Sequence, residues 1–230
     1  LLSLTIGRGM GLEGGELRDL ASGALLHDLG RVLLGEIALT KKGSLTSEEW
    51  AQVRLHPQEG AQAILAAAGT GQEVTATVAL EHHARLDGDG YPDLAGRTPH
   101  PFSRIVAVAD AYDAVTSRRP HRAARTPQDA MRILSEGSGS AFDPEVVTSF
   151  LSLLGERPPG SLFQVRSGEV VVVTCSGSDT GSQGLVVRDP DGKSVAKPQP
   201  VLLSDEDVIG PVLAEEAGID PSAVLEAVEA

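Results

Sequence analysis

Apolar residues recur at helical spacing through most of the first 155 residues, and this pattern predicts a mainly helical region. The expected helices are Leu-, Ala- and Val-rich stretches between polar turns: residues 17–34, 46–55, 60–68, 73–83 and 103–116, with two more starting near 127 and 144. Thr46 and Glu49 are spaced as a capping box. The Thr-Pro and Asp-Pro pairs at 126–127 and 143–144 place a capping residue before a proline in the first turn.

A loop and the start of the chain complete the description of this region. Residues 86–101 contain the turn signals Gly88, Gly90, Pro92 and Gly96, so a loop is expected there. Residues 1–6 read as a helix that is already under way, because no capping residue precedes them. We therefore expect the natural protein to continue upstream of Leu1.

The pattern changes again after the Pro-Pro-Gly sequence at 158–160. Residues 170–174 and 186–187 are rich in β-branched side chains, and residues 189–192 have the composition of a turn. This predicts a small antiparallel β module. The end of the chain, from Asp205, is acidic and expected to favour helix, with a further helix start at Asp220-Pro221. We predict two domains, 1–155 and 156–230, in a mainly α fold with a C-terminal antiparallel β module.

Charge and cysteine content narrow the classes of function. The chain has 19 basic and 32 acidic residues, a net charge of −13, so binding to DNA or RNA is not expected. A small anionic substrate remains compatible with this net charge, because metal ions and a few arginines can make the potential positive at a binding site. The single cysteine, Cys175, excludes an intrachain disulfide and favours a cytoplasmic location. No apolar run has the length of a transmembrane segment, so no membrane segment is expected in this chain.

Histidine and aspartate residues in unusual surroundings are the candidates for chemistry. They are His27, Asp28, His56, His82, His83 and Asp110. The first pair ends an apolar run, and Asp110 lies inside an apolar helix, where a carboxylate is costly unless it is paired or binds a metal. Imidazole and carboxylate are ligands for divalent metals. Each residue taken alone also has an ordinary structural explanation. We interpret His100 and His121, in Pro- and Arg-rich segments, as surface residues without a role in the site.

The order and spacing of five motifs carry a family resemblance. They are Leu-Leu-His-Asp-Leu-Gly-Arg at 25–31, the segment 42–57 ending in His-Pro, His-His at 82–83 with Asp-Gly-Asp-Gly-Tyr-Pro at 87–92, the segment 109–120, and Phe-Asp-Pro at 142–144. This sequence resembles the HD-GYP family, a bacterial branch of the HD phosphohydrolases. The resemblance covers nearly all of residues 20–150.

The resemblance implies an HD-domain helical bundle, a five-helix core extended by two helices, that holds two or three divalent metal ions. Iron or manganese is usual in the family, and the donors also suit zinc or nickel. By resemblance, one ion is held by His27, Asp28 and Asp110, and a second, with a third if present, by His56, His82 and His83. Asp28 is expected to bridge the ions, because a carboxylate has two oxygens. The implied reaction hydrolyses cyclic di-GMP to pGpG and in some cases to GMP.

Five further residues are expected at the substrate. Arg31 follows Asp28 by three residues and should hold a phosphate oxygen. Asp113, one turn after the predicted ligand on its helix, is expected to orient Arg31 or a ligand. The resemblance places Arg119 and Arg122 on the guanine and phosphate groups. Tyr91 is expected either to touch the substrate or to fix its own loop.

Three departures from the family pattern leave other functions open. Arg31 stands where lysine is usual, Ala84 stands where glutamate is usual, and no histidine precedes His27. One alternative is therefore a degenerate domain that binds cyclic di-GMP or a partner protein as a sensor or scaffold. Another is an HD hydrolase of a different nucleotide. Candidate partners are GGDEF-type or other signalling proteins, and a homodimer is a candidate assembly.

Overall fold

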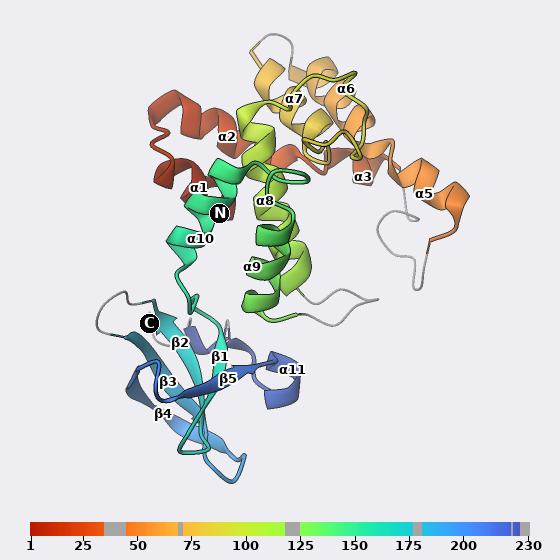
Figure 1. Ribbon diagram of the computed structural model, residues 1–230. Coiled ribbons are helices and arrows are strands. Elements are labelled where there is room, and N and C mark those ends of the chain that lie inside the picture. Colours follow the sequence, from red (N-terminus) through yellow and green to blue (C-terminus); the bar gives the residue numbers. More distant parts are fainter. Residues whose placement is uncertain (35–44, 69–70, 118–124, 177–180, 222, 226–230) are drawn as a thin grey trace. The chain divides into compact units, whose positions relative to one another are not determined.

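The computed structural model describes residues 1–34, 45–68, 71–117, 125–176, 181–221 and 223–225 (Figure 1). The chain divides into two compact units. The first consists of Leu1–Asp113 with Ile133–Phe150, and the second of Ala114–Arg132 with Leu151–Ala230. In the described parts of the chain, no helix combines the length and the apolar character that crossing a membrane requires.

Helices form most of the first unit. Those wholly within it are α1 (Leu2–Gly9), α2 (Gly14–Leu26), α3 (Leu29–Leu33), α5 (Ser47–Val53), α6 (His56–Ala68) and α7 (Glu73–Glu81). The helices α8 (Pro101–Thr116), α9 (Pro127–Glu136) and α10 (Pro144–Leu154) contribute residues to both units. Helix α7 packs against α2 and α6, and α6 packs against α3. Side chains such as Leu20, Val78 and Val108 are fully buried in this unit, as expected for a hydrophobic core.

Most of the predicted helix starts are confirmed. The Thr46 side chain accepts a hydrogen bond from the backbone N–H of Glu49, and the Glu49 carboxylate accepts one from the backbone N–H of Thr46. Helices α9 and α10 begin at the predicted prolines. Helix α6 begins at His56, four residues earlier than expected, because Pro57 is compatible with the first turn of a helix.

The stretch predicted as helical from 17 to 34 is interrupted at the His-Asp pair. His27 is the C-terminal cap of α2, and Asp28 is the N-terminal cap of α3. The prediction of one continuous helix was therefore wrong at this point. The apolar positions keep their spacing across the break, so periodicity alone does not show it. The interruption places both side chains at helix ends.

The second unit contains a five-stranded sheet. Its strands are β1 (Leu162–Val165), β2 (Val170–Cys175), β3 (Ser182–Arg188), β4 (Ser194–Leu203) and β5 (Val208–Val212). They lie in the order β4-β3-β2-β1-β5, and every neighbouring pair is antiparallel. Val171 and Val173 belong to one hydrophobic cluster and Val172 to another, so the central strand is covered on both faces.

The fold class is confirmed: the chain is mainly helical, with an antiparallel sheet in its C-terminal part. The expectation of helix from Asp205 onward was wrong in part. Residues 208–212 instead pair with β1 as β5, and a short helix, α11 (Ala214–Ala217), follows. The predicted helix start at Pro221 agrees with the helical conformation of residues 221 and 223–225. The domain boundary at 155 stays a prediction.

Candidate metal centre

Four of the predicted ligands come together at the ends of helices in the first unit. Asp28, His56, His82 and His83 each offer a ligand atom, and these four atoms lie within 4.8 Å of one another. Asp28 caps the N-terminus of α3, and His56 is the first residue of α6. His82 caps the C-terminus of α7, and His83 follows it. The end of a helix holds such side chains in fixed positions, because each is next to regular hydrogen-bonded backbone.

A close contact between two glycines brings α3 and α6 together. A Cβ atom on Gly30 would lie 1.9 Å from the carbonyl oxygen of His56 and 2.8 Å from the nitrogen of Gly60. Only glycine fits at that distance. Gly30 follows Asp28 by two residues, so this contact sets Asp28 against His56. The Gly30 of the first motif thus has a direct part in forming the cluster.

The Asp28 carboxylate lies between two sets of donors. Its Oδ1 is 3.2 Å from Nε2 of His56 and 3.6 Å from Nε2 of His82, while its Oδ2 is 3.7 Å from Nε2 of His27. Arg31 Nε donates a hydrogen bond of 2.7 Å to Oδ1. Burial acts to raise the pKa of this carboxyl, but its close contacts with the imidazoles of His56 and His82 and the positive charge of Arg31 outweigh burial and hold the pKa of Asp28 well below its usual range. Asp28 is therefore ionised.

The histidine tautomers leave lone pairs pointing into the cluster. Nδ1 of His56 donates to the carbonyl oxygen of Val53 at 2.7 Å, and Nδ1 of His82 donates to that of Ala79 at 2.9 Å. A neutral imidazole carries one N–H, so both Nε2 atoms are then acceptors. These two Nε2 atoms are only 3.2 Å apart. Since burial foremost lowers the pKa of His82, an extra proton is disfavoured, and a metal cation fits this set of acceptors.

His83 adds a further nitrogen to this cluster. Its Nε2 is buried and has no hydrogen-bond partner among the described residues. Burial, with the charges of His82 and His56, lowers the pKa of His83 to about 2, so the ring is neutral. An unsatisfied buried polar atom costs about 1–3 kcal/mol. Coordination of a cation would remove that cost. The donors therefore fit a divalent metal.

Of the other two predicted ligands, His27 lies beside the second oxygen of Asp28, and Asp110 lies beside His27. His27 Nε2 is 4.0 Å from Oδ1 of Asp110, which lies on α8. The Nδ1 of His27 donates to the carbonyl oxygen of Ala24 at 2.8 Å, so its Nε2 is also an acceptor. The six predicted ligands therefore form one continuous cluster, in which the two oxygens of Asp28 face different partners.

Tyr91 borders the cluster. Its ring lies 4.7 Å from that of His83 and 6.2 Å from that of His56, measured between centroids. Its backbone N–H donates to the carbonyl oxygen of His83 at 3.1 Å. A Cβ atom on Gly90 would lie 2.4 Å from that same oxygen, so glycine is needed where the loop closes on the histidine turn. Burial raises the pKa of Tyr91 to about 12, so the phenol keeps its proton.

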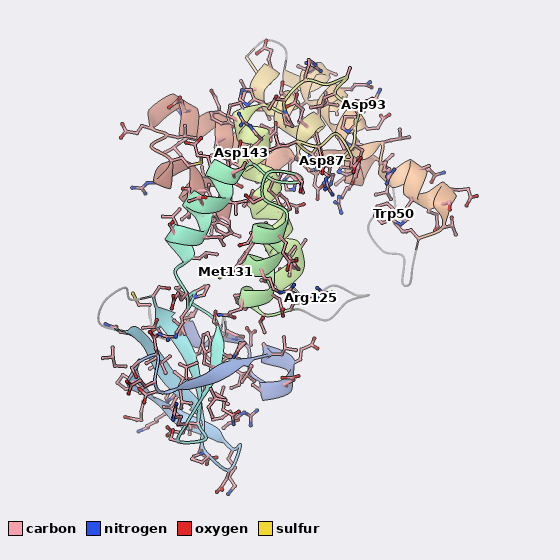
Figure 2. All side chains as sticks on the ribbon, in the orientation of Figure 1. Trp50, Asp87, Asp93, Arg125, Met131 and Asp143 are labelled. Atoms are coloured by element: carbon pink, nitrogen blue, oxygen red, sulfur yellow. The ribbon has the colours of Figure 1, made fainter. Side chains whose placement is uncertain are left out.

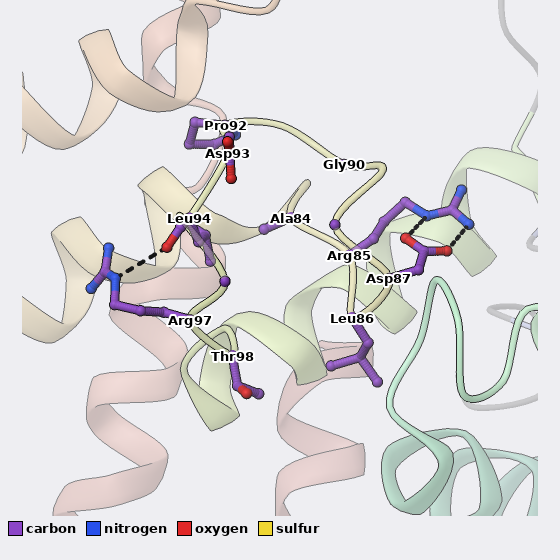
Figure 3. Close-up of a pocket in the computed structure, with 12 residues that line it drawn as sticks. Ala84, Arg85, Leu86, Asp87, Gly90, Pro92, Asp93, Leu94, Arg97 and Thr98 are labelled. Carbon is purple, nitrogen blue, oxygen red and sulfur yellow. Dashed lines mark hydrogen bonds and ion pairs between the residues drawn. The ribbon is translucent and has the colours of Figure 1, made fainter.

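The loop predicted after the His-His pair is confirmed, and it curls around a small cavity (Figure 3). The cavity has a volume of about 150 Å³ and is lined by residues between Ala84 and Thr98. Arg85 and Asp87 pair through two hydrogen bonds of 3.0 and 2.6 Å on one side of it. Arg97 donates to the carbonyl oxygen of Leu94 on another side. The buried Ala84 therefore borders open space.

Glu81 is a buried carboxylate that the sequence reading missed. Its Oε2 accepts hydrogen bonds from the backbone N–H of His100 at 2.7 Å and from Oγ of Ser103 at 3.1 Å. These bonds tie the end of α7 to the beginning of α8 at the base of the loop. A glutamate directly before the His-His pair, in an apolar stretch, was the available signal. The expectation that His100 lies at the surface was wrong in part, because it is half-buried and its Nδ1 accepts from the N–H of Phe102.

The predicted substrate residues differ in how far the structure describes them. Arg31 lies in the cluster through its bond to Asp28. Asp113 is exposed on α8. Arg119 and Arg122, together with His121, lie outside the described residues, so the contacts expected of them stay predictions.

Comparison with protein families agrees with this geometry. The model of the HD domain family matches residues 1–146. The chain belongs to the HD domain family. The predicted resemblance to HD-GYP proteins is confirmed at the level of the fold: Bd1817, an HDG"Y"P protein from Bdellovibrio bacteriovorus, superposes with a TM-score of 0.53 at 20% identity, covering 66% of this chain and 49% of that one. At this identity the structural match shows the fold alone.

Curated relatives carry names from one class of enzyme. The chain is 37% identical over 173 residues to the cyclic di-GMP phosphodiesterase PA4108 of Pseudomonas aeruginosa, which covers 75% of this chain and 41% of the relative. It is 38% identical over 143 residues to the cyclic di-GMP phosphodiesterase response regulator RpfG of Xanthomonas campestris, covering 62% and 38%. It is 34% identical to the 3′3′-cGAMP-specific phosphodiesterase 3 of Vibrio cholerae, covering 59% and 29%. The chain thus spans less than half the length of these relatives.

Proposed function

We propose that this protein is a metal-dependent phosphodiesterase that hydrolyses cyclic di-GMP to pGpG, to GMP, or to both. The observation that carries the proposal is the position of the Asp28 carboxylate, with Oδ1 facing His56 and His82 and Oδ2 facing His27. One carboxylate with imidazole rings beside both of its oxygens is a suitable bridge for two divalent cations. Two such cations would neutralise phosphate oxygens and supply a hydroxide at neutral pH.

The residues of the chain then have separate tasks. His56, His82 and His83 would hold one ion, and His27 and Asp110 another, with Asp28 between them. Backbone carbonyls hold the rings of His27, His56 and His82 through their Nδ1 atoms, which keeps every Nε2 directed inward. Iron or manganese is the expected metal, in two or three copies.

The neighbouring cation and aromatic ring suit a phosphodiester. Arg31 has a planar guanidinium, and its Nε is engaged with Asp28, so we propose that its remaining N–H groups face a phosphate oxygen. Tyr91 remains protonated at neutral pH because burial raises its pKa to about 12. It can therefore donate a hydrogen bond or pack against a base, and it closes one side of the site.

A specific observation supports a second substrate. Relatives at 30–35% identity bear the name 3′3′-cGAMP-specific phosphodiesterase. Cyclic GMP-AMP has the same phosphodiester ring and differs in one base, so the metal centre would act on both molecules. A domain that binds the dinucleotide without cleaving it stays the other alternative. The cytoplasmic location, signalling partners of the GGDEF type and a homodimer are likewise proposals.

The test combines metal analysis with turnover. Protein purified without oxygen would be analysed for metal per chain and then incubated with cyclic di-GMP, 3′3′-cGAMP and a linear dinucleotide in separate reactions. Two or more ions per chain, with turnover of cyclic di-GMP exceeding that of the other two, is the expected result. Faster cleavage of 3′3′-cGAMP would reassign the substrate. Metal-free protein that binds cyclic di-GMP without turnover would instead establish the sensor alternative.

A further inference from the structure

Arg54 is a charged residue near the centre to which neither the motifs nor the relatives give a task. It is the C-terminal cap of α5, the helix that also carries Trp50 (Figure 2). Its guanidinium carbon lies 5.3 Å from the centroid of the Tyr91 ring. The Tyr91 ring lies 4.7 Å from the ring of His83. One aromatic ring thus stands between this cation and a candidate metal ligand.

The backbone around Arg54 is tied to the metal centre. The N–H of Arg54 donates to the carbonyl oxygen of Trp50 at 3.0 Å. The carbonyl oxygen of Val53 accepts the 2.7 Å hydrogen bond from Nδ1 of His56. Val53 is itself buried. A shift of Arg54 relative to His56 would therefore break helical hydrogen bonding or expose an apolar side chain.

The charge of Arg54 has no acidic partner within the described part of the chain. By contrast, Arg31 pairs with Asp28, and Arg85 pairs with Asp87. The Arg54 residue is exposed, and its guanidinium lies over the ring of Tyr91. In a chain with a net charge of −13, an unpaired guanidinium beside the site would favour the approach of an anion.

A cyclic dinucleotide offers a second anionic group that such a cation can bind. Its ring contains two phosphodiesters on opposite sides, and a metal centre can neutralise only the one that is cleaved. We propose that Arg54, stacked on Tyr91, binds the second phosphodiester, the one that stays intact. This inference rests on the proposed function and assigns a residue that selects cyclic dinucleotides over phosphodiesters with a single phosphate.

The experiment compares two substrates of the metal-loaded protein. Cyclic di-GMP has the second phosphate, and bis(p-nitrophenyl) phosphate does not. The variants are Arg54→Ala, Arg54→Lys and, as a matched control, Arg18→Ala, an exposed arginine on α2. For Arg54→Ala we expect KM for cyclic di-GMP to rise about tenfold, as for the loss of one charge-assisted hydrogen bond. Its kcat, and both constants for the single phosphodiester, should stay within about twofold of wild type.

Lysine should restore part of the KM because it keeps the charge but loses the planar fork, and Arg18→Ala should change neither substrate. Equal losses on both substrates, or no change on either, would overturn the inference. If wild-type protein cleaves neither substrate, the proposed function fails. The inference is then tested by calorimetry, which compares the Kd for cyclic di-GMP of wild-type protein and of Arg54→Ala. Equal Kd values would rule the inference out.

Discussion

The helical unit and the β module bury different kinds of side chain. Among the described residues, the buried histidines and carboxylates are His56, Glu81, His82 and Asp143, and all of them belong to the helical unit. In the second unit the buried polar residues are serines, Ser161 and Ser182. Burying a charge or an imidazole is costly unless a partner compensates. The helical unit therefore contains the groups suited to chemistry, whereas the interior of the β module consists mainly of packed apolar side chains.

The apolar residues give the complementary view. In the β module, Val171, Val172 and Val173 have no exposed surface, and they divide between clusters on the two faces of the sheet. Each gains from being removed from water without any demand on charge or protonation. In the candidate metal centre, by contrast, the Nε2 atoms of His56 and His82 lie 3.2 Å apart, an arrangement that a bound cation would stabilise.

The largest expected effect is the loss of a ligand from the helical unit. His82→Ala removes one buried nitrogen from the cluster, and turnover of cyclic di-GMP should fall more than about 100-fold, since loss of a ligand's hydrogen-bond partner alone costs about 10- to 100-fold. At least one metal ion per chain should also be lost. Steady-state kinetics and elemental analysis measure the two effects. A variant that keeps half its activity would show that His82 is not a ligand.

The matched change in the β module should affect stability instead. Leu203 is fully buried in the cluster with Phe163 and Val171, so Leu203→Ala should lower the free energy of unfolding by about 2–5 kcal/mol. Turnover by the folded protein should be unchanged. Urea unfolding and kinetics at a temperature well below the transition would test this. A loss of turnover while the protein is folded would show that the β module also affects catalysis, and not stability alone.

An intermediate effect is expected at Glu81. Glu81→Ala leaves the N–H of His100 and the hydroxyl of Ser103 without their acceptor, at a cost of about 1–3 kcal/mol. Because His82 and His83 follow directly, metal affinity and turnover should also fall, by about tenfold. Glu81→Gln keeps an acceptor oxygen and should restore most of both. If alanine lowers stability but not metal affinity, Glu81 serves the helical fold alone.

Local features of the sequence predicted most of the fold. The capping box at Thr46 and the prolines that open α9 and α10 act on neighbouring backbone, and the structure confirms them. The break at His27-Asp28 and the strand β5 were missed. Helical spacing continues across the break, and the acidic residues near 205 obscured a strand that is stabilised by pairing with β1.

The metal centre could be predicted only as a set of residues. Four candidate ligands, Asp28 among them, come together, His27 lies beside Asp28, and Asp110 lies beside His27. The approach of Asp28 to His56 depends on the Gly30–Gly60 contact, which joins segments thirty residues apart. The contacts of Glu81 and Arg54 also join distant segments, so the local sequence does not show which groups these two side chains contact.

The smallest expected effect compares one carboxylate in each unit through pH. Asp143 accepts hydrogen bonds from the N–H groups of Glu145 and Val146 at the start of α10 (Figure 2) and pairs with Arg104. Burial raises its pKa, but the bond to Arg104 and then the two N–H groups outweigh burial and lower the pKa of Asp143 below its ordinary value. A lowered folded-state pKa contributes stability above the unfolded-state pKa of about 4 and loses it as the pH falls through the folded value.

Asp143→Asn removes the charge that pairs with Arg104, so it should lower the free energy of unfolding by about 1 kcal/mol at pH 7, and the difference from wild type should shrink as the pH falls below about 4. Asp207, in the β module, is the matched control. Hydrogen bonds from Ser204 lower its pKa too, but it is exposed, and water competes for those bonds, so Asp207→Asn should have a smaller effect at every pH. Urea unfolding at several pH values gives both comparisons. A difference for Asp143→Asn that stays constant with pH would mean that Asp143 contributes through packing, and the charge contrast between the two units would then be limited to the metal centre.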